Sequence, residues 1–130
     1  MLEMRRSEER GAAALEFAII LPIFMLIIFG MVEFGFLLNR YISVTQAARE
    51  GARVMSLGYP TDGSGGAEEH AVSTTPDLTG NIACDGSEGV GSSGETEVIM
   101  RCESTYDLSL FAINSPIRVE STTRMRKEGG

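Results

Sequence analysis

The side chains with the most reactive chemistry in this sequence are two cysteines, Cys84 and Cys102, and one histidine, His70. The cysteines flank a segment rich in Gly and Ser, Asp85–Glu95, that is expected to form a loop. A disulfide closing a loop of this size stabilises a small domain by roughly 3 kcal/mol, so we expect the two cysteines to be bridged. The alternative is two buried free thiols that act as small hydrophobic groups. These three side chains are too few for a four-ligand zinc site or a histidine-based active site, and His70 is expected to be exposed on a short helix.

The acidic residues do not form a recognisable metal-binding motif. Asp62, Asp77, Asp85 and Glu88 lie among glycines and serines, but their spacing is not that of a twelve-residue calcium loop, and turn formation explains them better. The sequence also lacks a nucleophile elbow and a phosphate-binding loop. We therefore expect no metal, no cofactor, no small-molecule substrate and no enzymatic activity.

Charge is distributed unevenly along the chain. The 130 residues include 11 Lys and Arg and 18 Asp and Glu, which gives a net charge of −7. Residues 1–59 contain six charges of each sign, so the excess lies in residues 60–130, with twelve acids and five bases. An acidic chain is poorly suited to bind nucleic-acid phosphates, and we expect no nucleic-acid partner. The length allows one small domain with an anchor or tail.

The first third of the chain contains a long apolar run, residues 12–38. Any functional residue in this part must be positioned by the helix that the run forms. Its 27 residues contain two charges, Glu16 and Glu33, and the sixteen residues Phe17–Val32 contain none. Such a helix can span a bilayer with each carboxylate near an interface, so we predict a transmembrane helix over residues 12–38. The alternatives are a buried core helix, for which the remaining sequence offers little cover, and a cleaved signal peptide. The residues after the run, Asn39–Tyr41, are not a small-residue cleavage site.

The charges around this run do not decide the orientation of the chain. Three arginines precede the run and three follow it closely: Arg5, Arg6 and Arg10 against Arg40, Arg49 and Arg53. The cysteines favour an oxidising compartment for the C-terminal part. We therefore expect a single-pass membrane protein with its N-terminus in the cytoplasm and its C-terminal part outside it.

The helical pattern continues past the membrane run, over residues 39–57. Small side chains recur at i, i+4 and i+8 at Ser43, Ala47 and Gly51, a stripe that permits close helix packing. The stripe could face the chain's own C-terminal domain or neighbouring subunits. We predict one helix from Ala12 to Leu57, kinked at Pro22.

Residues 58–130 are predicted to form a small extracytoplasmic α+β domain. A flexible linker, Gly58–Gly66, precedes a short helix, Ala67–Ser73. Three strands are expected: Asn81–Cys84, the alternating segment Glu97–Tyr106, and a last strand after Pro116. The predicted fold class is therefore α+β, a long N-terminal helix followed by a small antiparallel sheet.

The segment Arg10–Phe17, with the sequence RGAAALEF, resembles a class III signal: a charged leader, a Gly, four residues, a Glu and an aromatic residue before an apolar run. With Ile20–Pro22 and the block Gln46–Arg53, it resembles the TadE-like proteins of tight-adherence pilus systems. The resemblance covers residues 10–55 well and extends only weakly into the C-terminal part.

This resemblance implies a role for each residue of the motif. Gly11 would be the last residue of a cytoplasmic leader, residues 1–11, removed by a prepilin peptidase at the inner (cytoplasmic) membrane, and Ala12 would become the new N-terminus. Glu16, followed by the aromatic Phe17, would pair with the N-terminal amine of an adjacent subunit. A structural alternative for Glu16 is a carboxylate favoured by the dipole at a helix N-terminus.

The partners that the resemblance implies are the membrane, the prepilin peptidase, other pilin or pseudopilin subunits and the pilus secretion machinery. The length of the chain favours a minor or assembly-assisting subunit, located in the membrane or in the pilus. The main rival hypothesis is an uncleaved, membrane-anchored binding module of the cell envelope. An exported enzyme would need a catalytic constellation that the sequence does not offer.

Overall fold

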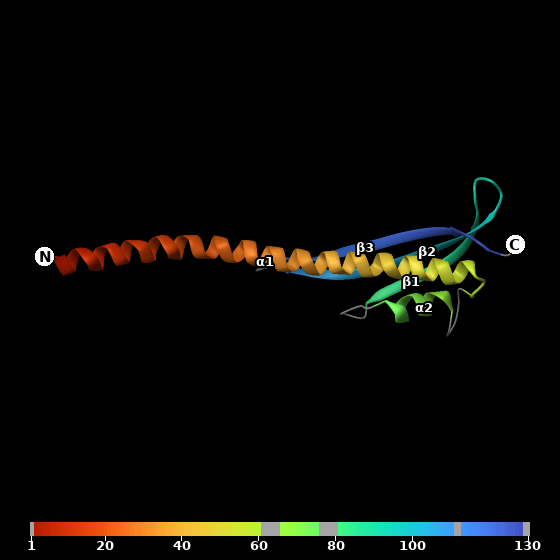
Figure 1. Ribbon diagram of the computed structural model, residues 1–130, viewed down its shortest axis with the longest axis horizontal. Coiled ribbons are helices and arrows are strands. Elements are labelled where there is room, and N and C mark those ends of the chain that lie inside the picture. Colours follow the sequence, from red (N-terminus) through yellow and green to blue (C-terminus); the bar gives the residue numbers. More distant parts are fainter. Residues whose placement is uncertain (1, 61–65, 76–80, 111–112, 129–130) are drawn as a thin grey trace. The chain divides into compact units, whose positions relative to one another are not determined.

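The computed structural model describes residues 2–60, 66–75, 81–110 and 113–128. Its elements are α1 (Leu2–Ser56), α2 (Ala67–Thr74), β1 (Ile82–Val90), β2 (Thr96–Leu110) and β3 (Ile113–Arg126) (Figure 1). They form two compact units, residues 1–35 and residues 36–130. The predicted class, α+β with a long N-terminal helix and a small antiparallel sheet, is confirmed.

The first unit consists of the N-terminal part of α1. This helix begins at Leu2, ten residues before the predicted start at Ala12. The leader is rich in Leu, Met, Glu and Arg, which favour helix, and Gly11 costs only about 1 kcal/mol relative to alanine. The helix also continues on both sides of Pro22. The kink expected there stays a prediction.

The end of α1 is set by Gly58, which has a left-handed backbone with φ of +94°. The Gly58 amide donates to the Met55 carbonyl at 3.0 Å, and the Tyr59 amide donates to the Val54 carbonyl at 3.4 Å. This pair of bonds is the Schellman motif, which satisfies the last helical carbonyls and favours glycine at the left-handed position. The predicted linker Gly58–Gly66 lies mostly in residues 61–65, which are outside the described residues.

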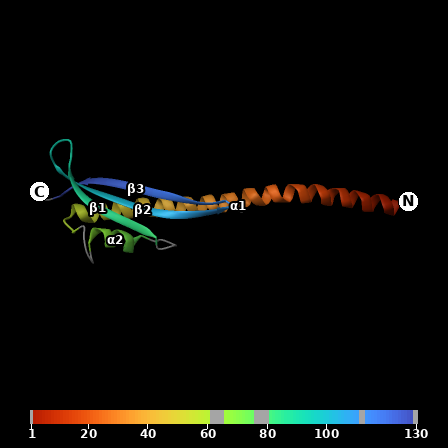
Figure 2. The same ribbon diagram turned by 180° about the vertical axis from the view of Figure 1, so that it is seen from behind.

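The second unit has a three-stranded antiparallel sheet in the order β1-β2-β3. The turn from β1 to β2 is closed by a hydrogen bond from the Gly91 amide to the Glu95 carbonyl at 2.8 Å. Cys84 of β1 lies opposite Cys102 of β2, with Cα atoms 4.1 Å apart, and the two are joined by a disulfide. The predicted bridge is thus present in the structure. The short helix α2 packs beside β1, as both views show (Figure 2).

All three strands are longer than predicted. The expected loop Asp85–Glu95 is wrong over its first half, because β1 continues to Val90 in register with β2. The Gly86 amide on this edge donates to a Glu68 carboxylate oxygen at 2.7 Å, so a side chain from α2 satisfies the strand's outer edge. Pro116 lies inside β3 rather than before it. It is tolerated because β3 is an edge strand, where a missing amide donor need not break the ladder.

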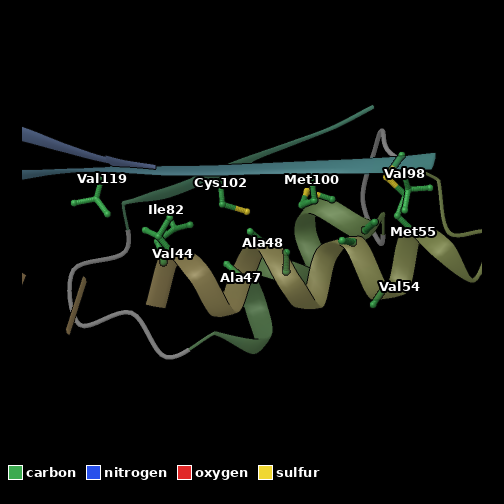
Figure 3. Packing of buried hydrophobic residues seen from close by; sticks show 13 residues of the cluster. Val44, Ala47, Ala48, Val54, Met55, Ile82, Val98, Met100, Cys102 and Val119 are labelled. Carbon is green, nitrogen blue, oxygen red and sulfur yellow. The ribbon is translucent and has the colours of Figure 1, made fainter. Parts of the chain in front are cut away.

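The core of this unit lies between the C-terminal part of α1, α2 and one face of the sheet. The β2 side chains Val98, Met100 and Cys102 are fully buried and point toward α1 (Figure 3), which confirms the alternation predicted for Glu97–Tyr106. On β3, Val119 is buried and Ile117 is half-buried, as predicted. The whole buried cluster is Val44, Ala47, Ala48, Ala52, Val54, Met55, Ala67, Ala71, Ile82, Val98, Met100, Cys102 and Val119.

Candidate functional site

Gly11 and Ala12, the residues of the predicted cleavage site, lie within α1 and are exposed. A Cβ atom built on Gly11 would meet nothing within 4 Å, and the backbone there has no positive φ. Neither packing nor backbone conformation therefore requires glycine, although glycine inside a helix costs about 0.5–1 kcal/mol relative to alanine. The described fold gives Gly11 no structural purpose.

Glu16 and Phe17 follow on the same helix. Glu16 lies four residues after Ala12, about one helical turn, so the two residues share one side of α1. Both Glu16 and Phe17 are exposed, and Phe17 retains 65% of its accessible surface. Because one continuous helix holds all four motif residues, their spacing is fixed along its axis.

The helix that follows carries a large exposed apolar surface. Its exposed large hydrophobic residues are 37–68% accessible at nearly consecutive positions from Leu15 to Phe24 and from Met31 to Phe34, so they surround the helix. An 18-residue window within Gly11–Ser56 is apolar enough to cross a membrane, and none of it is buried. An exposed apolar surface that surrounds a helix in this way is larger than the apolar patches found on soluble monomers. Within the described residues, α1 therefore contains a single candidate membrane span, near the N-terminus.

The small-residue stripe lies further along α1, in the second unit. Ser43, Ala47 and Gly51 are all buried there. A Cβ atom on Gly51 would stand 2.9 Å from Cγ and Cε of Met100 and 3.0 Å from Cβ of Ala71. The structure therefore uses this stripe within the chain, against β2 and α2. Of the two alternatives left open by the sequence, packing onto the chain's own domain is the one seen here.

A small polar cluster lies on the same part of α1. Arg53 donates to both carboxylate oxygens of Glu50, at 3.0 Å from Nε and 2.7 Å from Nη2, as the i, i+3 spacing predicts. Nε2 of His70, on α2, lies 3.3 Å from Glu50 Oε1. The hydrogen bond from Arg53 lowers the pKa of Glu50, burial opposes it, and His70 adds a smaller lowering effect. His70 is thus half-buried against α1 rather than exposed, and its contact with Glu50 was not foreseen.

The outer face of the sheet carries paired charges that the sequence analysis missed. Arg101 of β2 donates to Glu120 of β3 at 2.7 Å, and Arg118 of β3 donates to Glu103 of β2. This contact raises the pKa of Arg118. The alternation of charged residues along each strand indicates an exposed charged face. Which of these charges pair across the two strands depends on the register between the strands. Surface pairs of this kind contribute little stability.

The described residues contain no group of three or more His, Cys, Asp and Glu side chains that could hold a metal ion. Of the acidic residues weighed for calcium, Asp85 and Glu88 lie in β1, and Glu88 accepts a hydrogen bond from Lys127 at 2.6 Å. Asp62 and Asp77 lie outside the described residues. The residues that remain as a candidate functional site are therefore those of α1.

The comparison with protein families matches this helix. The family model described as "TadE-like protein" matches residues 11–53, which begin at Gly11 and end at Arg53. No curated protein and no solved structure matches the chain. The match does not include the sheet, where the sequence resemblance was weak. The match is consistent with a TadE-like pilus assembly protein, and over residues 11–53 the chain is similar to that family.

Proposed function

We propose that this chain is a pseudopilin of a tight-adherence pilus system, processed by a prepilin peptidase between Gly11 and Ala12. Residues 12–38 hold the mature chain in the inner membrane, and residues 39–57 continue the helix into the extracytoplasmic space. There the sheet domain forms, within residues 58–130. Its partners are the peptidase, other pilin or pseudopilin subunits and the pilus secretion machinery.

The observation that carries this proposal is the position of Gly11. The TadE-like match begins at this residue, at the start of the apolar part of α1, whose surface is exposed. A Cβ atom at position 11 would meet nothing, so the fold does not explain the glycine. A protease that must approach the backbone closely does explain it, because glycine has no side chain to obstruct the approach.

Glu16 is assigned to assembly on electrostatic grounds. A carboxylate at the edge of a membrane helix is costly unless it is paired. By analogy with pilins, its partner is the N-terminal amine of an adjacent mature subunit, which is positively charged at neutral pH. Before cleavage the nitrogen of Ala12 is an amide and carries no charge. Processing would therefore create the charge that Glu16 pairs with, and Phe17 would pack among the neighbouring apolar helices.

The disulfide supports an extracytoplasmic location for the sheet domain. Bridged cysteines persist in oxidising compartments and are rare in the cytosol, where thiols are kept reduced. The leader would then remain in the cytoplasm, on the side of the membrane where prepilin peptidases cut.

The test is the substitution Gly11→Val in cells that contain the prepilin peptidase. A branched side chain at this position should block the cut, and the chain should accumulate with its leader of eleven residues. Gly30→Val is a matched control, because Gly30 lies in the same helix and a Cβ there also meets nothing within 4 Å. The control should be processed normally. Equal processing of both variants would contradict the proposed cleavage site.

A second candidate function is an uncleaved, membrane-anchored binding module of the cell envelope. It is favoured by the extent of the family match, which ends at Arg53 and leaves the whole sheet domain unmatched. In that case the wild type and both glycine variants would all retain residues 1–11, because no form of the chain would be cut.

A further inference from the structure

A groove in the second unit is lined by six polar or charged residues together with Met125 of β3. It has a volume of about 400 Å³ and lies along α1 and the end of α2. A carboxylate group needs only a small part of this volume, because one water molecule takes up about 30 Å³. The groove can therefore admit a charged side chain from outside the chain. Its polar residues are Gln46, Arg49, Glu50, Arg53, Thr74 and Thr75.

The positive charge in this groove is not balanced within the chain. Both oxygens of the Glu50 carboxylate accept hydrogen bonds from Arg53, so these two charges neutralise each other. Arg49 is exposed and makes no hydrogen bond or ion pair with any residue that the structure describes. Its guanidinium group has five N–H donors, and the amide of Gln46, three residues earlier on the same side of α1, adds further donors. This arrangement is suited to bind a carboxylate.

The turn between β1 and β2 carries two carboxylates that could fill this role. Oε1 of Glu97 and Oε1 of Glu95 lie 2.7 Å and 2.9 Å from the position of a Cβ atom built on Gly91, so two like charges come close together. Arg126 of β3 is the register partner of Glu97, but neither carboxylate forms an ion pair with a described residue. The turn projects from the end of the sheet (Figure 1). A cation placed between the two carboxylates would relieve their repulsion.

We propose that the turn with Glu95 and Glu97 of one copy of this chain docks into the Arg49 groove of a second copy. The Arg49 guanidinium donates to the two carboxylates, and each copy neutralises a charge that the other leaves unbalanced. The groove and the turn are different surfaces, so the contact is head-to-tail and can add further copies in a row. This contact goes beyond the proposed function, because it does not depend on cleavage after Gly11.

Charge complementarity within one chain favours a second copy as the occupant. Arg49 lacks an acidic partner, and Glu95 and Glu97 lack a basic partner, among the residues that the structure describes. A free anion would explain the groove and leave the two carboxylates unbalanced. A second copy satisfies both sites with one contact. Exposed charges of this kind set orientation more than affinity, and salt weakens them.

The experiment places the photoreactive residue p-benzoylphenylalanine at position 46, in the wall of the groove, of the full chain. Two copies with different tags are produced together in membranes and irradiated, and the crosslinked peptides are identified by mass spectrometry. The expected product has the size of a dimer and joins position 46 of one copy to residues 91–97 of the other. Arg49→Glu in the photoreactive copy should lower its yield at least about fivefold, because an attraction becomes a repulsion.

Charge reversal in both copies tests whether the two sites meet. Glu95→Lys/Glu97→Lys in the second copy should lower the yield when Arg49 is unchanged, and should restore it when the photoreactive copy carries Arg49→Glu. Arg124→Glu is the matched control, because Arg124 is an exposed arginine of β3 that does not line the groove. This control should leave the yield unchanged. Circular dichroism checks that each variant is folded.

Three results would overturn the inference: no product of dimer size, a crosslink to another segment or another protein, or a yield that the charge reversals do not change. Each of them leaves the proposed processing untouched, because the crosslink can be measured on chains with or without residues 1–11. Conversely, normal cleavage of Gly11→Val would contradict the proposed processing and leave this contact standing. The two proposals therefore fail separately.

Discussion

The backbone of Gly51 on α1 lies directly against the side chain of Met100 on β2, and a Cβ at position 51 would stand 2.9 Å from two Met100 atoms. Gly51→Val should therefore destabilise the sheet domain by roughly 1–3 kcal/mol, because two branches must displace buried groups. Gly51→Ala should cost less than Gly51→Val, because alanine adds one methyl group and favours helix, although that methyl group still stands 2.9 Å from Cγ and Cε of Met100. The measurement is denaturant unfolding of the full chain in micelles, followed by near-ultraviolet circular dichroism.

A double variant tests whether the contact with Met100 causes the destabilisation by Gly51→Val. In a Met100→Ala background, Gly51→Val should lower the free energy of unfolding by a smaller amount, because the shorter alanine side chain leaves space for the valine. Gly35→Val serves as the control, because a Cβ there meets nothing within 4 Å. An equal loss from Gly35→Val would contradict the assignment of the effect to packing against Met100.

The disulfide should contribute measurably to stability. Cys84 and Cys102 are eighteen residues apart, and closing a loop of this size stabilises a domain by roughly 3 kcal/mol. The double variant Cys84→Ala/Cys102→Ala should unfold at a lower denaturant concentration than the oxidised wild type. Adding a reductant should lower the midpoint of the wild type and leave that of the variant unchanged. A wild type that is insensitive to reductant would refute the prediction.

The stability of the sheet domain should fall in acid partly because of Glu50. Its pKa is lowered, mainly by the hydrogen bond from Arg53, so the folded state favours the charged carboxylate. A lowered pKa gives a contribution that is fully present above about pH 4.3, the unfolded value, and is lost as pH falls through the lowered value. Glu50→Gln should destabilise the protein modestly at pH 7 and flatten the acid limb of a plot of unfolding midpoint against pH. Arg53→Gln should flatten the same limb, and an unchanged acid limb in both variants would contradict this origin.

Glu16 should be required for assembly and not for cleavage. Glu16→Gln removes the charge that would attract the amine of a neighbouring subunit, while Gly11 and Ala12 are unchanged. The variant should be cut like the wild type but should reduce pilus formation severalfold, counted by electron microscopy of whole cells. Glu33→Gln is the matched control, because Glu33 is the other carboxylate of the apolar run. A normal number of pili in cells with Glu16→Gln would contradict the role of Glu16 in assembly.

The parts of the fold that could be predicted are those set by local patterns. The apolar run of α1 has a composition and length that few other structures share, and the alternation at Val98, Met100 and Cys102 is the signature of a strand with one buried face. The helix Ala67–Ser73 was also found within one residue of its observed end. These features depend on residues that are close together in the sequence.

The parts that could not be predicted depend on contacts between distant residues. A segment with the sequence DGSEGV has low strand propensity, and it becomes part of β1 because β2 pairs with it and Glu68 of α2 binds its outer edge. His70 contacts Glu50, twenty residues earlier, only because α2 docks on α1. Register between strands likewise decides which charges meet on the outer face.

The candidate site could be proposed from the sequence for a different reason. Gly11, Ala12, Glu16 and Phe17 form one local string, so their spacing could be recognised without a fold. The structure adds one fact that no pattern contains: the space around Gly11 is open, so that packing does not explain the glycine. The sequence alone left the small stripe ambiguous, and the contact between Gly51 and Met100 assigns it to the chain's own core.

The central claim is that the chain is cut before its membrane helix, and the mass of the protein purified from membranes tests it most directly. We expect the membrane form to begin at Ala12, with residues 1–11 removed. A membrane form that still begins at Met1, isolated from cells with an active prepilin peptidase, would contradict it.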